Sequence, residues 1–303
     1  MSPRDGSMRP ANSGESLDRP WDLQSAARCR PALGKEPRNF TGDQRKDCGE
    51  DAFFLASPAS AEAFIGIADG VGGWRENDVD PALFAWALME HCRELAESAE
   101  ASSPMPDAAQ SSSRARCPKR LLKKGFENMY AATDALGSST ALLASLDHAT
   151  GVLRLANLGD SGAILLRGPR CEIVMETKPQ VRGFNNPRQL MKAPVGVNTS
   201  GDSPDIADEY EAEVEDGDLL VLATDGVFDN VHSAQIAEIV RQVRGASIEE
   251  LAETILHEAY EKSVSKWGIS TPWSIACQKR GLLHIGGKVD DITVVVARVA
   301  RAG

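Results

Sequence analysis

The chain alternates between short apolar segments that end at turn residues and longer segments in which apolar residues recur at helical spacing. The short segments predict β-strands, and the longer segments predict amphipathic helices. Strands are expected near residues 52–57, 63–68, 139–146, 152–158, 161–166, 171–175, 209–214, 218–224 and 291–299. Helices are expected at residues 80–98, 119–134, 233–243, 247–265 and 272–281.

Two of these helices begin with recognisable capping signals. Asp80 followed by Pro81 suits an N-cap and the first helical position, and Ser247 with Glu250 three residues later suits a capping box. Strands dominate both ends of the pattern and helices come in blocks, which is not a regular βαβ alternation. The order predicts an α+β fold with largely antiparallel sheets and helices packed outside them.

Three segments lack this periodicity. Residues 1–40 are rich in Pro, Gly and Ser, and we expect a disordered leader there, which its arginines also make a candidate transit segment. The globular domain is expected to span residues 41–303. Within it, residues 98–118 predict a flexible insertion between two helices, and residues 176–208 predict a lid or binding loop.

Composition limits the partners of the protein. The chain has 303 residues, of which 42% are hydrophobic, and its 33 basic and 44 acidic residues give a net charge of −11. This balance argues against binding to nucleic acid or to an anionic membrane surface. No apolar run reaches about 18 residues, so no membrane span is expected. The acidic excess is either solvated surface or includes ligands for cations.

The six cysteines are spread widely along the chain. None belongs to a C-x-x-C pair and no histidine cluster accompanies them, which argues against a zinc site. Scattered thiols of this kind suit a reducing compartment.

Several carboxylates stand where an expected strand begins or ends. Asp69, Asp160 and Asp225 follow apolar strands and have glycine beside them, whereas Glu50–Asp51 and Asp290–Asp291 precede strands. Antiparallel pairing brings the starts and ends of strands to the same edge of a sheet. These five acidic sites are therefore predicted to converge.

Converging carboxylates repel one another, and their pKa values rise unless a cation is present. Oxygen-only ligands favour Mg²⁺ or Mn²⁺, and two such ions about 3.5–4 Å apart can turn a bridging water into a hydroxide that attacks phosphorus. The sequence offers no rival nucleophile, since it lacks G-x-S-x-G and a C-x5-R loop. The alternative for any single Asp-Gly is an ordinary turn, and the alternating glutamates of residues 209–215 suit a solvated strand face.

Six short segments occur in a fixed order: Glu50–Asp51, Asp69–Trp74, Gly137–Ala141, Asn157–Gly162, Ala223–Asn230 and Asp290–Thr293. Together they resemble the metal-dependent protein phosphatases of type 2C, over about residues 41–300. The resemblance implies two antiparallel β-sheets in a sandwich flanked by α-helices, in agreement with the α+β prediction. It also implies hydrolysis of phosphoserine and phosphothreonine by a hydroxide that bridges two Mn²⁺ or Mg²⁺ ions.

The resemblance assigns metal-binding roles to residues at the strand ends. These residues are Glu50, Asp51, Asp69, Gly70, Asp160, Asp225 and Asp290. Asp69 corresponds to the carboxylate that bridges both ions, and Asp225 and Asp290 correspond to further ligands of the first ion. The carbonyl of Gly70 corresponds to a ligand of the second ion. Glu50 and Asp51 correspond to acids that act on the same ion, mostly through its waters. Asp160 corresponds to an acid linked to a weaker third ion.

Two positions depart from the family pattern. Many members place an Arg four residues before the first acid to grip the substrate phosphate, whereas here Lys46 stands there with Arg45 beside it. Lys supplies charge without the bidentate fork of Arg. Many members also place a His after the first Asp-Gly as the leaving-group acid, and here Val71 takes its place. Either a metal-bound water serves as that acid, or the leaving group is handled differently.

Trp74, residues 184–190 and Ser203–Asp205 are similar to the branch that includes the mitochondrial phosphatase and its plastid relatives. This similarity implies a mitochondrial or plastid location, with a cytoplasmic one as the alternative. Phosphoproteins are the expected partners, and a monomer is expected. Two other hypotheses are a regulatory pseudoenzyme that keeps the fold and a metal-dependent hydrolase of a small phosphoester.

Overall fold

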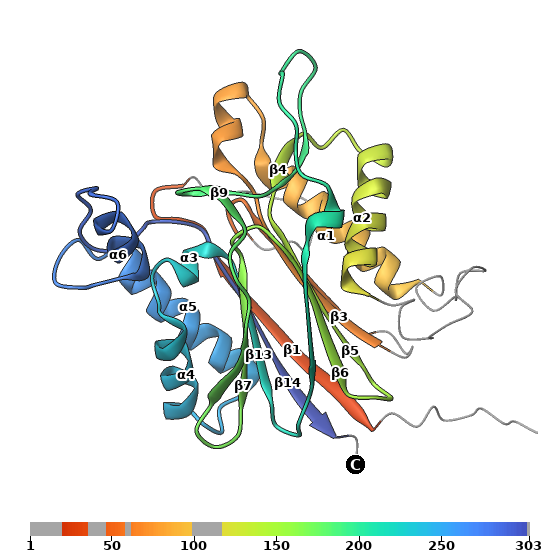
Figure 1. The fold of residues 1–303 in the computed structure, drawn as a ribbon, viewed down its shortest axis with the longest axis vertical. Coiled ribbons are helices and arrows are strands. Elements are labelled where there is room, and N and C mark those ends of the chain that lie inside the picture. The colour runs from red at the N-terminus through yellow and green to blue at the C-terminus, as the bar shows by residue number, and fades with distance from the viewer. Residues whose placement is uncertain (1–19, 36–46, 58–61, 99–116, 302–303) are drawn as a thin grey trace, which may run out of the picture.

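The computed structural model describes residues 20–35, 47–57, 62–98 and 117–301. At its centre, two five-stranded antiparallel sheets pack face to face (Figure 1). The first sheet has the order β1 (Trp21–Arg30), β14 (Ile292–Arg301), β13 (Leu219–Ala223), β7 (Gly162–Arg167) and β8 (Glu172–Glu176). The second has the order β12 (Asp208–Glu213), β6 (Val152–Leu158), β5 (Ala141–Asp147), β3 (Glu62–Asp69) and β2 (Asp51–Ala56). The predicted α+β fold is confirmed.

Helices cover the outer face of each sheet (Figure 1). On the second sheet lie α1 (Pro81–Glu97) and α2 (Pro118–Ala132), and on the first lie α4 (Ser233–Gln242) and α5 (Ile248–Val264). Shorter helices include η1 (Gly72–Asn77), α3 (Asp225–Phe228) and α6 (Pro272–Gln278). Both predicted capping signals are present, because Asp80 accepts from Ala82 N and Ser247 forms a capping box with Glu250.

The predicted loop at residues 176–208 is built from short pieces. It contains β9 (Val181–Gly183), β10 (Asn186–Pro187), β11 (Leu190–Lys192) and η4 (Pro204–Ile206). The strand β11 pairs with β4 (Gly137–Ser139), so this segment is joined to the main body by a small ladder. The predicted insertion at residues 98–118 lies almost wholly outside the described residues.

Covered faces explain why the central strands are almost continuously apolar. On β14, Val294 and Val296 belong to the core beneath α5, while Val295 and Ala297 belong to the core between the sheets. Successive side chains of a strand point to opposite faces, so a strand covered on both faces needs apolar residues at nearly every position. This arrangement leaves the strand ends as the places where acids can collect.

The prediction of a disordered leader over residues 1–40 is wrong for residues 21–30, which form the edge strand β1 along β14. Leu23 and Ala27 are buried between the sheets, but much of the strand is polar. Arg28 forms an ion pair with Glu253, and the guanidinium of Arg30 lies 3.4 Å from the centre of the Tyr260 ring. Hydrophobic periodicity missed the strand because its outer positions carry arginines whose guanidinium groups contact residues of α5.

Cys29 of β1 and Cys48 form a disulfide with a Cα–Cα distance of 5.1 Å. The disulfide ties β1 to the residues that lead into Glu50 and Asp51. The interpretation that the thiols suit a reducing compartment therefore does not hold for this pair. The sequence could not reveal the pairing, because it depends on the position of a strand that the pattern missed.

Replacing Cys29 by Ser is expected to lower the free energy of unfolding by about 2–4 kcal/mol, because the disulfide joins cysteines 19 positions apart and restricts the unfolded chain. Urea denaturation without reductant measures this loss, and a reductant should lower the wild type to the level of the variant. Cys117→Ser is the control, since Cys117 is a free cysteine. Equal stability of Cys29→Ser and wild type would contradict this expectation.

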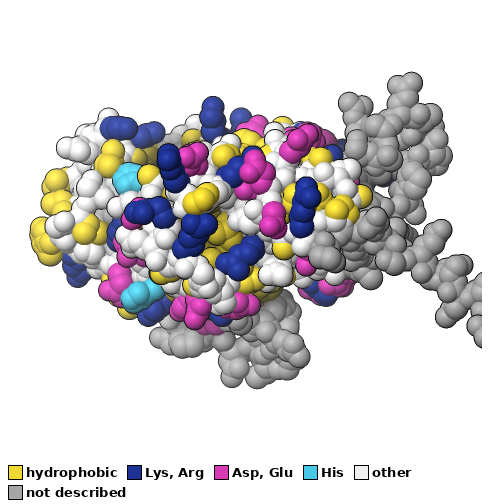
Figure 2. Space-filling view, turned by 90° about the horizontal axis from the view of Figure 1, so that it is seen from below, with side chains coloured by type: hydrophobic (Ala, Val, Ile, Leu, Met, Phe, Trp, Pro, Cys, Tyr) yellow, Lys and Arg dark blue, Asp and Glu magenta, His cyan; other side chains and the backbone are white. Residues whose placement is uncertain are grey.

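None of the helices in the described part of the chain is long and apolar enough to cross a membrane. On the face shown in Figure 2, basic and acidic side chains are interspersed among apolar ones. The glutamates of β12 are exposed, as expected of a solvated strand face. These exposed acids are separate from the acids at the strand ends, which lie at the edge of the sandwich.

Candidate metal centre

Acids from three strand ends meet at one edge of the sandwich. Asp69 ends β3, Asp160 follows β6, and Asp225 opens α3 directly after β13. Each offers a carboxylate oxygen, and these oxygens lie within 4.8 Å of one another. Three carboxylates at this spacing form a cluster that a divalent cation can hold together.

Glu50 and Asp51 reach the same edge through the pairing of β2 with β3, which places Asp51 opposite Asp69. The backbone N–H of Gly70 donates to the carbonyl of Glu50 over 3.1 Å. A side chain at Gly70 would place its Cβ 2.6 Å from that carbonyl oxygen. Only glycine permits this close approach of the two segments.

The Gly137–Ala141 segment supports Asp69 from behind. The N–H of Asp69 donates to the hydroxyl of Thr140 over 3.1 Å, and the N–H of Thr140 donates to the carbonyl of Asp69 over 3.0 Å. The indole of Trp74 donates to the hydroxyl of Ser138 over 2.6 Å. These contacts give the Ser-Ser-Thr motif a physical role, which is to fix the end of β3 and the turn that follows it.

Asp290 lies at the same edge and shares a cation with two other acids. The ammonium group of Lys288 lies 2.5 Å from a carboxylate oxygen of Asp225, 2.7 Å from one of Asp229 and 3.0 Å from one of Asp290. A positive group thus stands among three carboxylates. The acids are arranged so that a cation is needed to balance them.

Burial and mutual repulsion perturb the protonation of these acids. Burial, followed by the charge of Asp225, raises the pKa of Asp69 well above its ordinary value and raises the pKa of Asp160 to about 7. The same two causes raise the pKa of Asp229 to about 7 and that of Asp290 to about 6. Raised carboxylate pKa values show that the cluster lacks sufficient positive charge of its own.

The donor set fits Mn²⁺ or Mg²⁺. The buried oxygens Asp51 Oδ1 and Asp160 Oδ1 have no hydrogen-bond partner among the described residues. Asp51 receives one hydrogen bond on its other oxygen, from the hydroxyl of Thr224 over 2.9 Å. Unpartnered carboxylate oxygens within an all-oxygen cluster are the chemistry that hard cations prefer.

Several charged side chains in contact with these acids were missed by the sequence analysis, among them Asp229, Lys288, Lys35 and Arg75. Asp229 had a usable signal, because a spacing of four residues from Asp225 places both on one face of a helical turn. The three basic residues had none. Their contacts with acids depend on how distant loops fold back onto the site.

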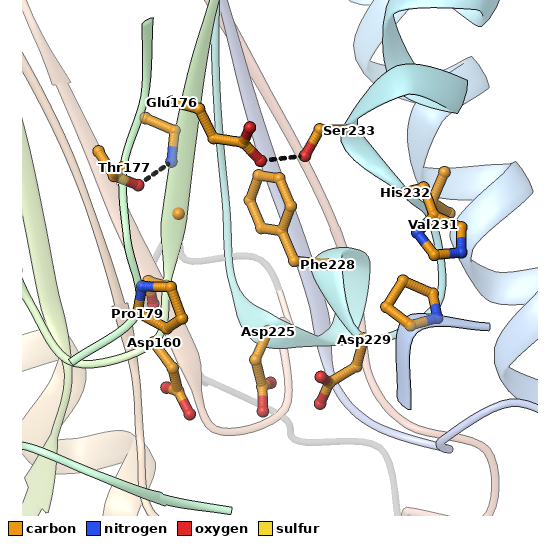
Figure 3. A pocket seen from close by; sticks show the side chains of 14 residues that line it. Asp160, Glu176, Thr177, Pro179, Asp225, Phe228, Asp229, Val231, His232 and Ser233 are labelled. Atoms are coloured by element: carbon orange, nitrogen blue, oxygen red, sulfur yellow. Dashed lines mark hydrogen bonds between the residues drawn. The ribbon is translucent and has the colours of Figure 1, made fainter. Parts of the chain in front are cut away.

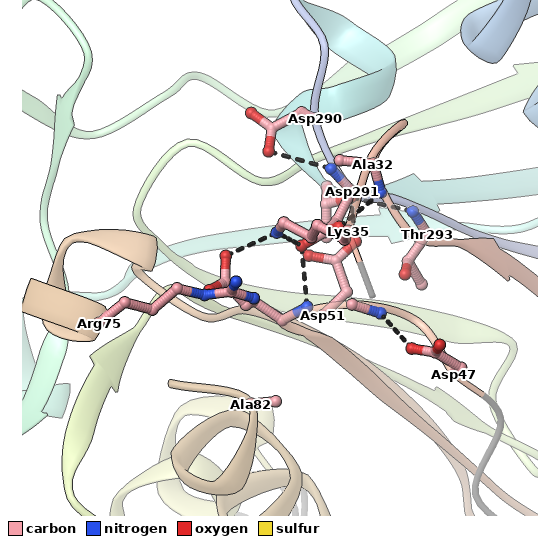
Figure 4. Close-up of polar contacts among 12 residues, drawn as sticks. Ala32, Lys35, Asp47, Asp51, Arg75, Ala82, Asp290, Asp291 and Thr293 are labelled. Atoms are coloured by element: carbon pink, nitrogen blue, oxygen red, sulfur yellow. Dashed lines mark hydrogen bonds and ion pairs between the residues drawn. The ribbon is translucent and has the colours of Figure 1, made fainter. Parts of the chain in front are cut away.

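Asp291 points away from Asp290 and organises the backbone beside the centre (Figure 4). Its carboxylate accepts from the N–H groups of Ala32 and Glu50, each over 2.8 Å, and forms an ion pair with Lys35. This network clamps β1 and the segment before β2 to the start of β14. Asp291 thus holds the scaffold of the site and is engaged by protein groups.

The two residues predicted to grip phosphate, Arg45 and Lys46, lie outside the described residues. Val71, which stands where the resemblance implies a leaving-group acid, donates its N–H to the carbonyl of Ser138 over 2.9 Å. Its side chain carries no titratable group. Neither the position of Lys46 nor that of Val71 therefore identifies a phosphate-binding side chain among the described residues.

A pocket of about 310 Å³ opens beside the acids (Figure 3). Asp160, Asp225 and Asp229 line one side of it, and Phe228 lies between them and Glu176. The hydroxyl of Ser233 donates to Glu176 over 2.5 Å. The pocket gives the acid cluster access to a molecule at the surface.

Comparison with known proteins identifies the family that this fold and site define. A family model described as stage II sporulation protein E (SpoIIE) matches residues 60–300. The human protein phosphatase PTC7 homolog is 37% identical over 258 residues, which cover 83% of this chain and 80% of that protein. The chain therefore belongs to the PP2C-type family of serine/threonine protein phosphatases.

Solved structures agree with this assignment. The X-ray structure of the photosystem II phosphatase PBCP superimposes with a TM-score of 0.72 at 29% identity, covering 91% of this chain and 98% of that chain. The catalytic domain of the serine threonine protein phosphatase PstP, in complex with two manganese ions, shares the fold with a TM-score of 0.51 at 21% identity, covering 92% and 99%. The expected family and fold are thereby confirmed.

Proposed function

We propose that this chain hydrolyses phosphoserine and phosphothreonine in proteins with two Mn²⁺ or Mg²⁺ ions as cofactors. The observation that carries the proposal is the convergence of Asp69, Asp160 and Asp225 within 4.8 Å at the edge of this sandwich. When bound, the two ions would activate a shared water for attack on phosphorus and balance charge in the transition state. The overall reaction cleaves the phosphoester P–O bond and gives a free hydroxyl and inorganic phosphate.

Each acid has a proposed place in that centre. Asp69 would contact both ions, with Asp225 and Asp290 completing the ligands of the first. Glu50, Asp51 and the carbonyl of Gly70 would serve the second. The mutual contact of Glu50 and Gly70, and the pairing of Asp51 with Asp69, support this grouping.

Asp160 is proposed to hold a weaker third ion together with Asp229, which shares the pocket and a similarly raised pKa. The manganese-bound PstP structure supports the choice of metal through the shared fold. The presence of the metal-binding acids favours an active enzyme over a pseudoenzyme.

The substrate class is tested by comparing a phosphoserine peptide and its phosphothreonine equivalent with small phosphoesters in the presence of Mn²⁺. The proposal predicts phosphate release from both peptides, and loss of this release when a chelator is added. Turnover of small metabolite phosphoesters without turnover of any phosphopeptide or phosphoprotein would favour the alternative hydrolase. Bound Mn²⁺ without turnover of either class would favour the pseudoenzyme.

The segment 176–208 is proposed to act as a flap that shapes substrate choice. It is anchored by Phe184, whose ring stacks on Trp273 of α6 with centres 4.8 Å apart and planes 17° apart. The guanidinium of Arg280 lies 4.5 Å from the centre of the Phe184 ring. The flap therefore rests on residues next to Lys288, whose ammonium lies 4.9 Å from the Trp273 ring centre.

Replacing Phe184 by Ala is expected to raise KM for a phosphopeptide about 2- to 10-fold, because an aromatic pair contributes about 0.5–1.5 kcal/mol beyond its burial. The KM for p-nitrophenyl phosphate, which has no peptide to contact the flap, should change little. Phe184→Tyr, which keeps the ring, is the matched control. Equal changes in KM for both substrates would contradict a role in peptide choice.

A mitochondrial or plastid location is also proposed, supported by the similarity to PTC7 homologues and to the photosystem II phosphatase PBCP. A fluorescent fusion of residues 1–45 tests it, and diffuse cytoplasmic signal would count against it.

A monomeric state is proposed as well. Light scattering on the purified chain, with a mass of 32.5 kDa expected for one copy, tests that state.

A further inference from the structure

Two basic side chains, those of Lys35 and Arg75, form ion pairs with the carboxylate of Glu50. The ammonium of Lys35 lies 2.8 Å from Glu50 Oε2, and Arg75 Nε lies 2.5 Å from Glu50 Oε1. Glu50 itself is only 5% exposed. Both oxygens of a proposed ligand of the second ion are thus held by cations from distant parts of the chain.

Lys35 and Arg75 differ in exposure and in how many of their nitrogens are engaged by protein groups. Lys35 has a side chain 21% exposed, and its ammonium is shared between Glu50 and Asp291. The side chain of Arg75 is 47% exposed. Among the contacts of the described residues, Arg75 is engaged through Nε alone, so the two terminal nitrogens of its planar guanidinium make no contact there.

The backbone places Arg75 close to the proposed metal ligands. Arg75 lies on η1, which begins two residues after Gly70. A side chain at Gly72 would place its Cβ 2.9 Å from Glu50 Oε2, so the first turn of η1 rests on the Glu50 carboxylate. Gly70 donates its N–H to the carbonyl of Glu50, so Arg75 contacts the side chain of a residue whose backbone touches Gly70, another proposed ligand of the second ion.

We infer that Arg75 binds the phosphoryl group of the substrate, the role that the resemblance gave to the position of Lys46. The inference rests on the proposed function. Glu50 fixes the guanidinium through Nε, and the two terminal nitrogens present paired donors, the geometry that matches phosphate oxygens. Arg75 follows Asp69–Gly70 by five residues, so one segment of the chain would supply both a metal ligand and the phosphate-binding group.

The test is the affinity of Mn²⁺-loaded protein for inorganic phosphate, measured by calorimetry and as product inhibition, in wild type, Arg75→Gln and Arg75→Lys. Loss of a charge-assisted bidentate contact is expected to weaken phosphate binding by Arg75→Gln about 10- to 100-fold. Arg75→Lys, which keeps the charge but not the fork, should fall between the two. The KM for a phosphoserine peptide should rise in the same order.

A role limited to positioning Glu50 gives a different result. In that case Arg75→Gln would weaken Mn²⁺ binding, and at saturating Mn²⁺ its phosphate affinity would equal that of wild type, which would overturn the inference. Weakened phosphate binding in Arg45→Gln or Lys46→Gln, with wild-type binding in Arg75→Gln, would overturn it too. Arg93→Gln is the charge control, because Arg93 pairs with Glu90 and Glu97 on the exposed face of α1.

The outcomes also separate this inference from the proposed function. If wild type releases no phosphate from any phosphopeptide with Mn²⁺, the proposed function fails. In that case, titration with inorganic phosphate still tests whether Arg75 binds phosphate, because this measurement needs no turnover. Hydrolysis by wild type together with unchanged phosphate binding in Arg75→Gln would reject the role of Arg75 alone.

Discussion

Replacing Asp69 by Asn is expected to lower kcat/KM for a phosphoserine peptide by roughly 10³-fold or more, since loss of even an indirect partner of a metal ligand costs about 10–100-fold. Asp69 is the proposed bridge between both ions, and its carboxylate lies within 4.8 Å of those of Asp160 and Asp225. An amide offers one neutral oxygen in place of two charged ones. The variant should therefore bind Mn²⁺ weakly at both sites, as calorimetry would show.

The loss should be specific to the centre. Asp69→Asn removes a charge from a repelling cluster, so the variant should fold and, without metal, be at least as stable as wild type. Asp208→Asn, at an exposed position on the edge strand β12, is the matched control and should retain wild-type turnover. A kcat/KM of Asp69→Asn within a few-fold of the wild-type value would contradict the proposed mechanism.

The second large effect concerns stability and pH in the metal-free protein. Burial and the charge of Asp225 raise the pKa of Asp160 and Asp229 from 3.8 to about 7, and that of Asp290 to about 6. The folded chain therefore binds protons that the unfolded chain has released, so stability falls as pH rises from about 4 through 7. With one pKa unit worth about 1.4 kcal/mol, a drop of roughly 3 kcal/mol is expected for acids that share their protons.

Bound Mn²⁺ should offset the loss of stability that the metal-free protein shows as pH rises. At 100 times the dissociation constant each ion adds about 2.7 kcal/mol, so two ions are expected to stabilise the protein at pH 8 by about 5 kcal/mol. At pH 5 protons compete for the same oxygens and the gain should shrink. Urea denaturation at both pH values, with chelator or with Mn²⁺, measures all four states.

Asp290→Asn provides the matched variant for this experiment. It removes one repelling charge, so the chelated variant should lose less stability than wild type between pH 5 and pH 8. A chelated wild type that becomes more stable as pH rises over this range would contradict the account of the acid cluster. So would a gain from Mn²⁺ that is independent of pH.

The sequence predicted the fold and the acid cluster because both depend on patterns local to the chain. Apolar runs covered on both faces marked the central strands, and an acid directly after such a run, as at Asp69 and Asp225, marked the end of a strand. Antiparallel pairing then brought these ends together. The capping residues Asp80 and Ser247 were likewise predictable from the sequence, since a cap acts within one helical turn.

The contacts around the cluster could not be predicted because they join segments far apart in sequence. Lys288 meets Asp225 and Asp229 across about sixty residues, and Arg75 reaches back to Glu50 across 25. The edge strand β1 was not predicted because a strand that pairs through its backbone and contacts α5 through arginine guanidinium groups need not be apolar. The disulfide between Cys29 and Cys48 was hidden for the same reason.

The central claim is that the acid cluster binds two divalent cations that the chain uses to hydrolyse phosphoproteins. Its most direct test is to strip the protein with a chelator, titrate it with Mn²⁺, and record bound ions and phosphate release from a phosphothreonine peptide together. We predict no release from the stripped protein and recovery of turnover as two ions bind per chain. Turnover that persists in the stripped protein, or two bound ions without turnover, would contradict the claim.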